Sequence, residues 1–321
     1  MVVISEHVFI CWPRFFLLSD GCLYFLQEKV GLGSSACDAG KGKSKMSKNI
    51  THGYHLVKGK SHHAMEDYVF AQFKQVGDNE LGLFAIFDGH LSHDIPDYLR
   101  SHLFDNILNE PDFWTETEKA IRKAYRITDT NILEKAVDLG KGGSTAVTAI
   151  LINCQKLVVG NVGDSRAVIC KNGVAKQLSI DHEPNKERMT IENRGGFVTN
   201  FPGDVARVDG QLAVARAFGD KSLKEHLSSE PDVSVETIDE DTEFVVLASD
   251  GIWKVGFLFF WVTCIRISYS SPPPKKKGSA LPSVILYLYL VVEVLFLDME
   301  KRSSNIIGVA LQLNLRVNGS T

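Results

Sequence analysis

Two short apolar runs in this chain are each followed closely by Asp-Gly. Leu83–Phe87 precedes Asp88, and Phe244–Ala248 precedes Asp250 after a single serine. Runs of this length and composition predict buried strands. Each aspartate is therefore expected at the rim of a core, beside a glycine that lets the backbone turn and a ligand approach. Two such carboxylates meeting at one point would suit a hard cation such as Mg²⁺ or Mn²⁺.

A strand followed by Asp-Gly is more commonly a simple turn than a metal site. A third acidic element favours the metal, because Glu66 and Asp67 stand directly before another strand-like run, Tyr68–Phe73. Clustered like charges raise one another's pKa and destabilise a fold unless a cation offsets them. The pattern therefore indicates a divalent metal site, with plain turn residues as the alternative.

A series of short motifs follows along the middle of the chain. They are Met65-Glu66-Asp67, Phe87-Asp88-Gly89-His90, Gly142-Gly143-Ser144-Thr145-Ala146, Asn161-Val162-Gly163-Asp164-Ser165-Arg166, Asp181-His182-Glu183-Pro184, Arg207-Val208-Asp209-Gly210, Leu212-Ala213-Val214-Ala215-Arg216-Ala217-Phe218-Gly219-Asp220 and Ala248-Ser249-Asp250-Gly251-Ile252-Trp253. In this order the series resembles the type 2C protein phosphatases, the metal-dependent Ser/Thr phosphatase family, and most closely the plant members. Each motif alone is weak, but the ordered series is specific and covers about residues 50–254.

The resemblance implies two Mg²⁺ or Mn²⁺ ions held by carboxylates. Asp88 would bridge both ions, Glu66 and the carbonyl of Gly89 would complete one, and Asp250 would hold the other. Two metals roughly 4 Å apart activate a bridging water and neutralise the charge of a phosphate. The implied reaction is the hydrolysis of phosphoserine and phosphothreonine in proteins by that water.

Further residues would surround the metal pair. The resemblance assigns Asp67 to hold metal-bound water, and Asp164 matches a position that can bind a weaker third ion, although a turn is an equally good interpretation of it. His90 could protonate the leaving alkoxide, or it could only orient a neighbouring group by a hydrogen bond. Many family members clamp phosphate with an arginine where this chain has His62. Lys60 and His62 are the phosphate-binding candidates, and neither copies the guanidinium fork.

The elements that must position these residues are strands and helices of ordinary length. Apolar patterning predicts strands over 68–73, 81–87, 145–152, 156–161, 165–170 and 244–248, a hairpin at Asn172-Gly173 and a turn at Asp78-Asn79. Helices are predicted over 94–108, from a capping box at Thr115, and over 184–194. The pattern indicates an α+β fold, and the resemblance implies a central antiparallel β-sandwich with helices on both outer faces (four-layer αββα).

The chain divides into three parts by composition. Residues 1–49 are an atypical N-terminal segment ending in a flexible linker, 50–254 a phosphatase-like domain, and 255–321 an apolar segment unlike the family. The family's final strand and last metal-binding aspartate are expected to be missing or replaced, with Ser304 where the aspartate belongs. Losing both would weaken the metal site and expose a sheet edge. The rival hypothesis is therefore a catalytically impaired, phosphatase-like binding or regulatory protein.

Composition excludes several other classes. The net charge of −4 gives no general attraction to nucleic acid, and the cysteines lack C-x-x-C spacing. The N-terminus has no basic start and is interrupted by Glu6 and Arg14, unlike a secretory signal. The apolar stretch 284–297 is shorter than the roughly 20 residues of a membrane span and contains Glu293. We expect a monomeric cytoplasmic or nuclear protein whose partners are phosphorylated proteins, without nucleic acid or membrane.

Overall fold

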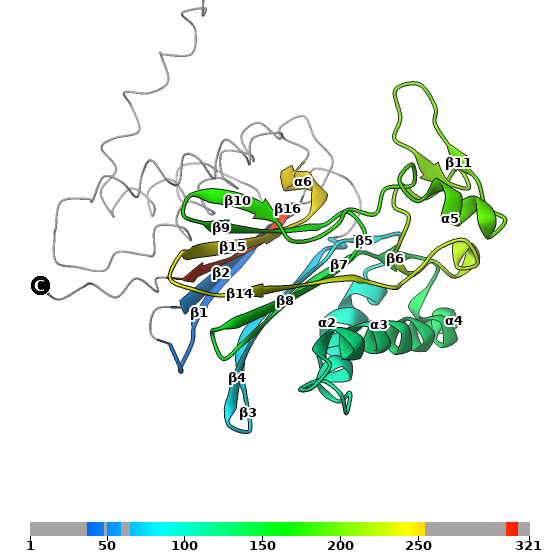
Figure 1. The fold of residues 1–321 in the computed structure, drawn as a ribbon. Helices are drawn as coiled ribbons and strands as arrows, with labels where there is room; N and C mark the ends of the chain where they lie inside the picture. The colour runs from blue at the N-terminus through cyan, green and yellow to red at the C-terminus, as the bar shows by residue number, and fades with distance from the viewer. Residues whose placement is uncertain (1–36, 48–49, 59–64, 254–305, 314–321) are drawn as a thin grey trace, which may run out of the picture. The chain divides into compact units, whose positions relative to one another are not determined.

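The structure is a computed structural model that describes residues 37–47, 50–58, 65–253 and 306–313. All of them lie in one compact unit, Cys37–Thr321. The central feature of this unit is a pair of stacked β-sheets (Figure 1).

Both sheets are antiparallel throughout. In spatial order, the six-stranded sheet contains β1 (Cys37–Lys43), β2 (Ile50–Val57), β16 (Ile306–Leu313), β15 (Thr242–Ala248), β9 (Arg166–Lys171) and β10 (Val174–Gln177). The five-stranded sheet contains β14 (Asp232–Thr237), β8 (Lys156–Val162), β7 (Ala146–Ile152), β4 (Asn79–Phe87) and β3 (Tyr68–Val76). All the predicted strands are present, and the predicted β-sandwich is confirmed.

Strand β4 explains why one of the apolar runs is continuous rather than alternating. Phe84 and Ile86 pack into the core between the two sheets, whereas Leu83 and Phe87 pack on the opposite face, under helices. All four are at most 1% exposed. A strand buried on both faces needs apolar residues at every position, and each such side chain stabilises the fold by about 1.5–3 kcal/mol.

Helices α2 (Asp94–Leu108) and α3 (Thr117–Glu134), followed by the short α4 (Ala136–Leu139), cover the outer face of the five-stranded sheet (Figure 1). The predicted bounds of α2 are confirmed. The predicted capping box of α3 is wrong: Glu116 occupies the N-cap without a side-chain hydrogen bond. The Thr115 hydroxyl donates instead to the carbonyl of Asp112 in the preceding turn, at 3.3 Å.

Smaller elements gather near one end of the sandwich. They are the three-stranded sheet of β13 (Phe218–Gly219), β6 (Gly143–Ser144) and β5 (Gly89–His90), the hairpin of β11 (Val198–Thr199) and β12 (Arg207–Val208), and the helices α5 (Arg188–Asn193), η2 (Lys221–Leu223) and α6 (Asp250–Trp253). Helix α5 is shorter than the predicted 184–194. Around it, a separate apolar cluster that includes Ile191, Val208 and Leu223 holds residues 188–227 together.

The turns between strands follow the sequence closely. Asn172 and Gly173 both have positive φ, 48° and 72°, as the predicted hairpin turn requires. The turn between β3 and β4 falls one residue earlier than predicted, because Val76 pairs with Asn79. Gly77, with φ of 59°, takes the left-handed position there.

The two ends of the domain differ from part of the prediction. Residues 37–43, assigned to a flexible linker, form the edge strand β1 on β2. The final strand was expected to be missing or replaced, and its place is filled by β16, which pairs with β2 on one side and with β15 on the other. Its inward residues Val309, Leu311 and Leu313 are at most 3% exposed, so alternation alone gives it a buried face.

The outer face of the six-stranded sheet is described only in part. Cys170, Phe244 and Val246 are buried there and Trp253 of α6 packs against them. Apart from α6, the helices predicted for this face would fall outside the described residues. Nor does the described part of the chain contain a helix long and apolar enough to cross a membrane; the stretch 284–297 lies outside it.

A histidine in the sandwich predicts how stability depends on pH. His52 on β2 is 4% exposed, and its ring lies 5.5 Å from that of Phe73 and 5.2 Å from that of Phe84. Burial lowers the pKa of His52 from 6.5 to about 4. Above pH 6.5 the residue is neutral in both states. Between pH 6.5 and 4 only the unfolded chain takes up the proton, so the free energy of unfolding falls as the pH falls.

We expect His52→Leu to remove this part of the acid sensitivity. The full shift corresponds to about 3 kcal/mol at most. Urea unfolding between pH 7 and 4.5 should show a shallower loss for His52→Leu than for the wild type. The exposed His102→Gln is the matched control and should follow the wild type. Parallel curves for wild type and His52→Leu would contradict the prediction.

Candidate functional site

The acidic residues next to β3 and β4 lie together at one end of these two strands. Tyr68 pairs with Phe87 at the ends of these strands, which places Asp67 and Asp88 just beyond the last pair. A methyl group added at Gly89 would fall inside van der Waals contact of the carbonyl oxygen of Glu66. The structure therefore brings Glu66, Asp67, Asp88 and Gly89 together, as the sequence predicts.

Asp164 and Asp250 lie at an equivalent place on the other sheet. Arg166 pairs with Ala248 at the ends of β9 and β15, and the two aspartates lie just beyond that pair. The loop that carries Asp164 also leaves the end of β8, where Val162 pairs with β7 beside β4. Both sheets thus present their aspartates at the same end of the sandwich.

The donor set suits a hard cation. It consists of carboxylates and one main-chain carbonyl, the oxygen ligands that Mg²⁺ and Mn²⁺ prefer. Asp67 is only 4% exposed. The carboxylates gather without closing around one point: within the described ranges, no three His, Cys, Asp or Glu side chains form a group that could hold an ion. Lys60, His62 and Ser304 fall outside those ranges, so their predicted places are untested.

Helix α6 fixes the direction in which the chain leaves Asp250. The Trp253 indole donates from Nε1 to the carbonyl of Ala248 at 2.6 Å. The Arg166 guanidinium lies 5.3 Å from the Trp253 ring centroid and forms an ion pair with the buried Asp181. These contacts tie the first residues after β15 to the start of β9, which carries the loop of Asp164.

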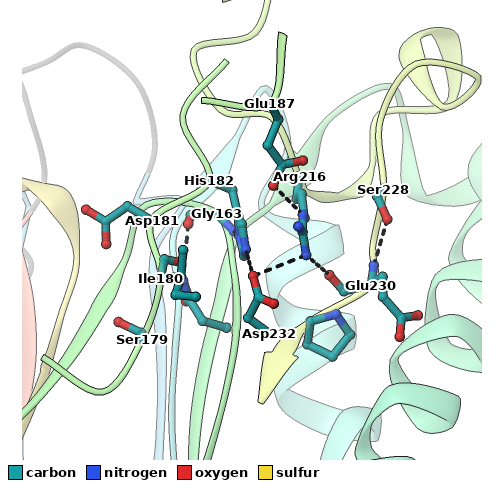
Figure 2. A network of polar contacts seen from close by, with 12 residues as sticks. Gly163, Ser179, Ile180, Asp181, His182, Glu187, Arg216, Ser228, Glu230 and Asp232 are labelled. Carbon is teal, nitrogen blue, oxygen red and sulfur yellow. Dashed lines mark hydrogen bonds and ion pairs between the residues drawn. The ribbon is translucent and has the colours of Figure 1, made fainter. Parts of the chain in front are cut away.

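A second polar network supports that loop from the other side (Figure 2). The amide of Gly163 donates to Nδ1 of His182 at 3.0 Å, and Nε2 of His182 lies 2.7 Å from Asp232. His182 is 1% exposed, and burial lowers its pKa below 6.5, against the opposing hydrogen bond to Asp232. Because Nδ1 accepts a main-chain proton, the ring is neutral with its proton on Nε2.

Arg216 extends this network towards α5. Its Nε donates to Glu187 at 2.7 Å, and one terminal nitrogen donates to the carbonyl of Glu230 at 2.9 Å and lies 3.4 Å from Asp232 (Figure 2). A guanidinium can make these contacts at once because its donors form a rigid fork. The segment around α5 is thus fixed to β14 beside the loop of Asp164.

His90 has a partner that the sequence did not reveal. Its Nε2 lies 2.8 and 2.9 Å from the two carboxylate oxygens of Asp220. Asp220 belongs to one of the motifs quoted above, but nothing in the motif indicates a contact with a residue 130 positions away. The predicted His90 therefore stands beside Asp88 and Gly89 with one ring nitrogen already engaged.

Comparisons with known proteins give a consistent result. The Protein phosphatase 2C family model matches residues 55–256. A probable protein phosphatase 2C of Arabidopsis thaliana (number 39) is 79% identical over 72% of this chain and 80% of its own length. One from Oryza sativa subsp. japonica (number 62) is 68% identical over 72% and 81%. Among solved structures, a serine-threonine phosphatase 2C from Toxoplasma gondii has a TM-score of 0.68 at 19% identity, covering 87% of this chain and 99% of that one, which is a likeness of fold alone.

Proposed function

Because the chain belongs to the protein phosphatase 2C family, we propose that it hydrolyses phosphoserine and phosphothreonine in proteins and depends on Mg²⁺ or Mn²⁺ to do so. The observation that carries the proposal is the gathering of Asp67, Asp88, Asp164 and Asp250 at one end of the sandwich. The ordered motifs and the identity to plant relatives support it.

In this proposal the gathered residues have distinct roles. Asp88, Glu66 and the carbonyl of Gly89 would help to hold the ions from the side of β3 and β4, and Asp250 would do so from the side of β15. Asp67 would orient water, and Asp164 would serve a weaker third ion. When bound, the ions would supply an activated water and neutralise the phosphate charge.

The protein's own groups handle the leaving group and the substrate. His90 lies two residues after Asp88 and is a quarter exposed, so it can reach a bound phosphate ester and give a proton to the departing seryl or threonyl oxygen. Lys60 and His62 are proposed to attract the phosphate as cations. Neither offers the two parallel hydrogen bonds of an arginine.

The test is Mn²⁺-dependent hydrolysis of a phosphothreonine peptide by the purified chain, with Asp88→Asn as the variant. We expect activity to fall more than about 100-fold, since residues that only orient a metal ligand are already worth 10–100-fold. Asp78→Asn, which removes an exposed carboxylate in the turn after β3, is the matched control and should keep full activity.

Calorimetric titration with Mn²⁺ separates the two hypotheses drawn from the sequence. A folded wild type that binds Mn²⁺ and hydrolyses the peptide supports the enzyme. A folded chain that binds the phosphopeptide without turnover would overturn it in favour of a binding or regulatory protein. A folded chain that binds neither Mn²⁺ nor phosphopeptide would contradict both.

A further inference from the structure

We propose that Asp220 is a positioning residue for His90 and that Gly143 is the gap through which the two side chains meet. This inference rests on the proposed function and assigns how its proton donor is held. It starts from a three-stranded sheet too short to be noticed in the sequence.

In that sheet, one row of residues runs from β13 through β6 to β5. Gly219 pairs with Gly143, and Gly143 pairs with His90. The middle position has no side chain, so a residue at the end of β13 can reach across β6. A methyl group added at Gly143 would lie 2.6 Å from Cγ of Asp220 and 2.6 Å from the carbonyl oxygen of Phe218. Real Cβ atoms do not approach that closely, so the contact requires glycine.

The carboxylate of Asp220 is held before it meets the histidine. Asp220 has φ of 49° and ψ of 49°, a left-handed conformation that aspartate tolerates better than most residues. Its amide donates to the carbonyl of Gly142 at 2.9 Å, and the residue is 4% exposed. On the strand before it, the amide of Gly219 donates to Asp129 at 2.9 Å. An unfavourable backbone conformation kept by several fixed contacts is typical of functional sites.

His90 is more exposed to solvent than its partner Asp220. The Asp220 side chain is 5% exposed and that of His90 is 25% exposed. The imidazole thus lies between a buried carboxylate and the accessible end of the sandwich. Because Nε2 faces Asp220, Nδ1 is the ring nitrogen directed away from it.

The step that this arrangement serves balances simply. Water adds to phosphorus, the bond between phosphorus and the seryl or threonyl oxygen breaks with its electrons on that oxygen, and Nδ1–H of His90 gives its proton to it, releasing the alcohol. The proton that the water loses then restores the imidazole by way of solvent. Asp220 touches neither substrate nor metal in this account. It fixes which nitrogen donates and where the ring points.

The experiment compares two substrates. A phosphothreonine peptide has an alkoxide leaving group that needs a proton, whereas p-nitrophenyl phosphate releases a phenolate that needs little help. We expect Asp220→Ala to lower kcat about 100-fold on the peptide and at least about tenfold less on the aryl phosphate. His90→Gln should give the same pattern, and the double variant should be no worse than His90→Gln alone, because residues that act as a unit are not additive.

Gly143→Ala tests the gap without changing either partner chemically. We expect it to give the pattern of Asp220→Ala, with Gly77→Ala as control, since a methyl group there meets no atom within 4 Å. If Asp220→Ala fails to fold by circular dichroism, the isosteric Asp220→Asn keeps one acceptor oxygen and takes its place.

The outcomes are distinct. A wild type inactive on both substrates would contradict the proposed function itself. An active wild type whose variants lose equally on both substrates, or whose double variant is additive, would overturn the positioning role alone.

Discussion

Ending the chain after residue 305 is expected to leave a protein that does not fold to a soluble state. Strand β16 pairs over its whole length with β2 and from Gly308 to Gln312 with β15. Burial of each of its three inward side chains stabilises the fold by about 1.5–3 kcal/mol, and this stabilisation would be lost. Their sum is comparable to the entire stability of an ordinary domain, about 5–15 kcal/mol, and β2 and β15 would be left with unpaired backbone.

A point variant makes the same test without shortening the chain. Leu311 is 1% exposed in the core between the sheets, so Leu311→Asp should lower the free energy of unfolding by more than about 3 kcal/mol. Val235→Asp is the matched control, because Val235 lies on the edge strand β14 and is 43% exposed. Urea unfolding and soluble yield are the measurements. A chain ending at 305 with the wild-type urea midpoint would show that β16 does not complete the sheet.

The two ends of this sheet show where local sequence patterns stop being informative. Strand β1 looked like a linker because of its glycines, yet Gly40 and Gly42 stand opposite Tyr54 and His52 in the register. A methyl group at either glycine would strike the ring across from it. Glycine in an edge strand covered by a cross-strand ring is a packing device. The pairing that reveals it is not visible in the strand's own residues.

Strand β16 was missed for a different reason. Its alternation of Val309, Leu311 and Leu313 predicts a strand of ordinary kind, but no pattern says which slot in which sheet it fills. That slot lies between β2 and β15, partners far apart in sequence. Buried strands such as β4 and β15 were predictable because a strand that is buried on both faces has an apolar residue at nearly every position.

The residues of the candidate site also fall into those that local sequence predicts and those that depend on pairing between distant strands. Asp88 and Asp250 were predictable because each lies within two residues of the end of its own strand, so position along the chain gives position at the rim. Asp67 follows from the short-range register of β3 and β4. The pairing of His90 with Asp220 was not predictable, because it depends on the register of three two-residue strands and on the absence of a side chain at Gly143.

Gly89→Ala is expected to abolish most activity while leaving a folded protein. The added methyl would enter the space of the Glu66 carbonyl oxygen and lie 2.7 Å from Cγ of Pro96. Neither neighbour can move freely, since one is backbone and the other a buried proline in α2. We expect a stability loss of about 1–3 kcal/mol from overpacking. Activity should fall more than about 100-fold, because a small misplacement of catalytic groups is enough for that.

The control must carry a methyl group without a collision. Gly203 lies in open space with φ of 82°, so Gly203→Ala costs only the left-handed backbone penalty, about 1–2 kcal/mol. The two variants should therefore be similar in urea and different in turnover and in Mn²⁺ titration. Equal turnover of the two variants would mean that the close approach of residue 89 to the Glu66 backbone is not needed for activity. It would remove Glu66 from the proposed metal site. Loss of Mn²⁺ binding by Gly89→Ala alone would tie the steric contact to the metal, because overall stability is matched between the two proteins.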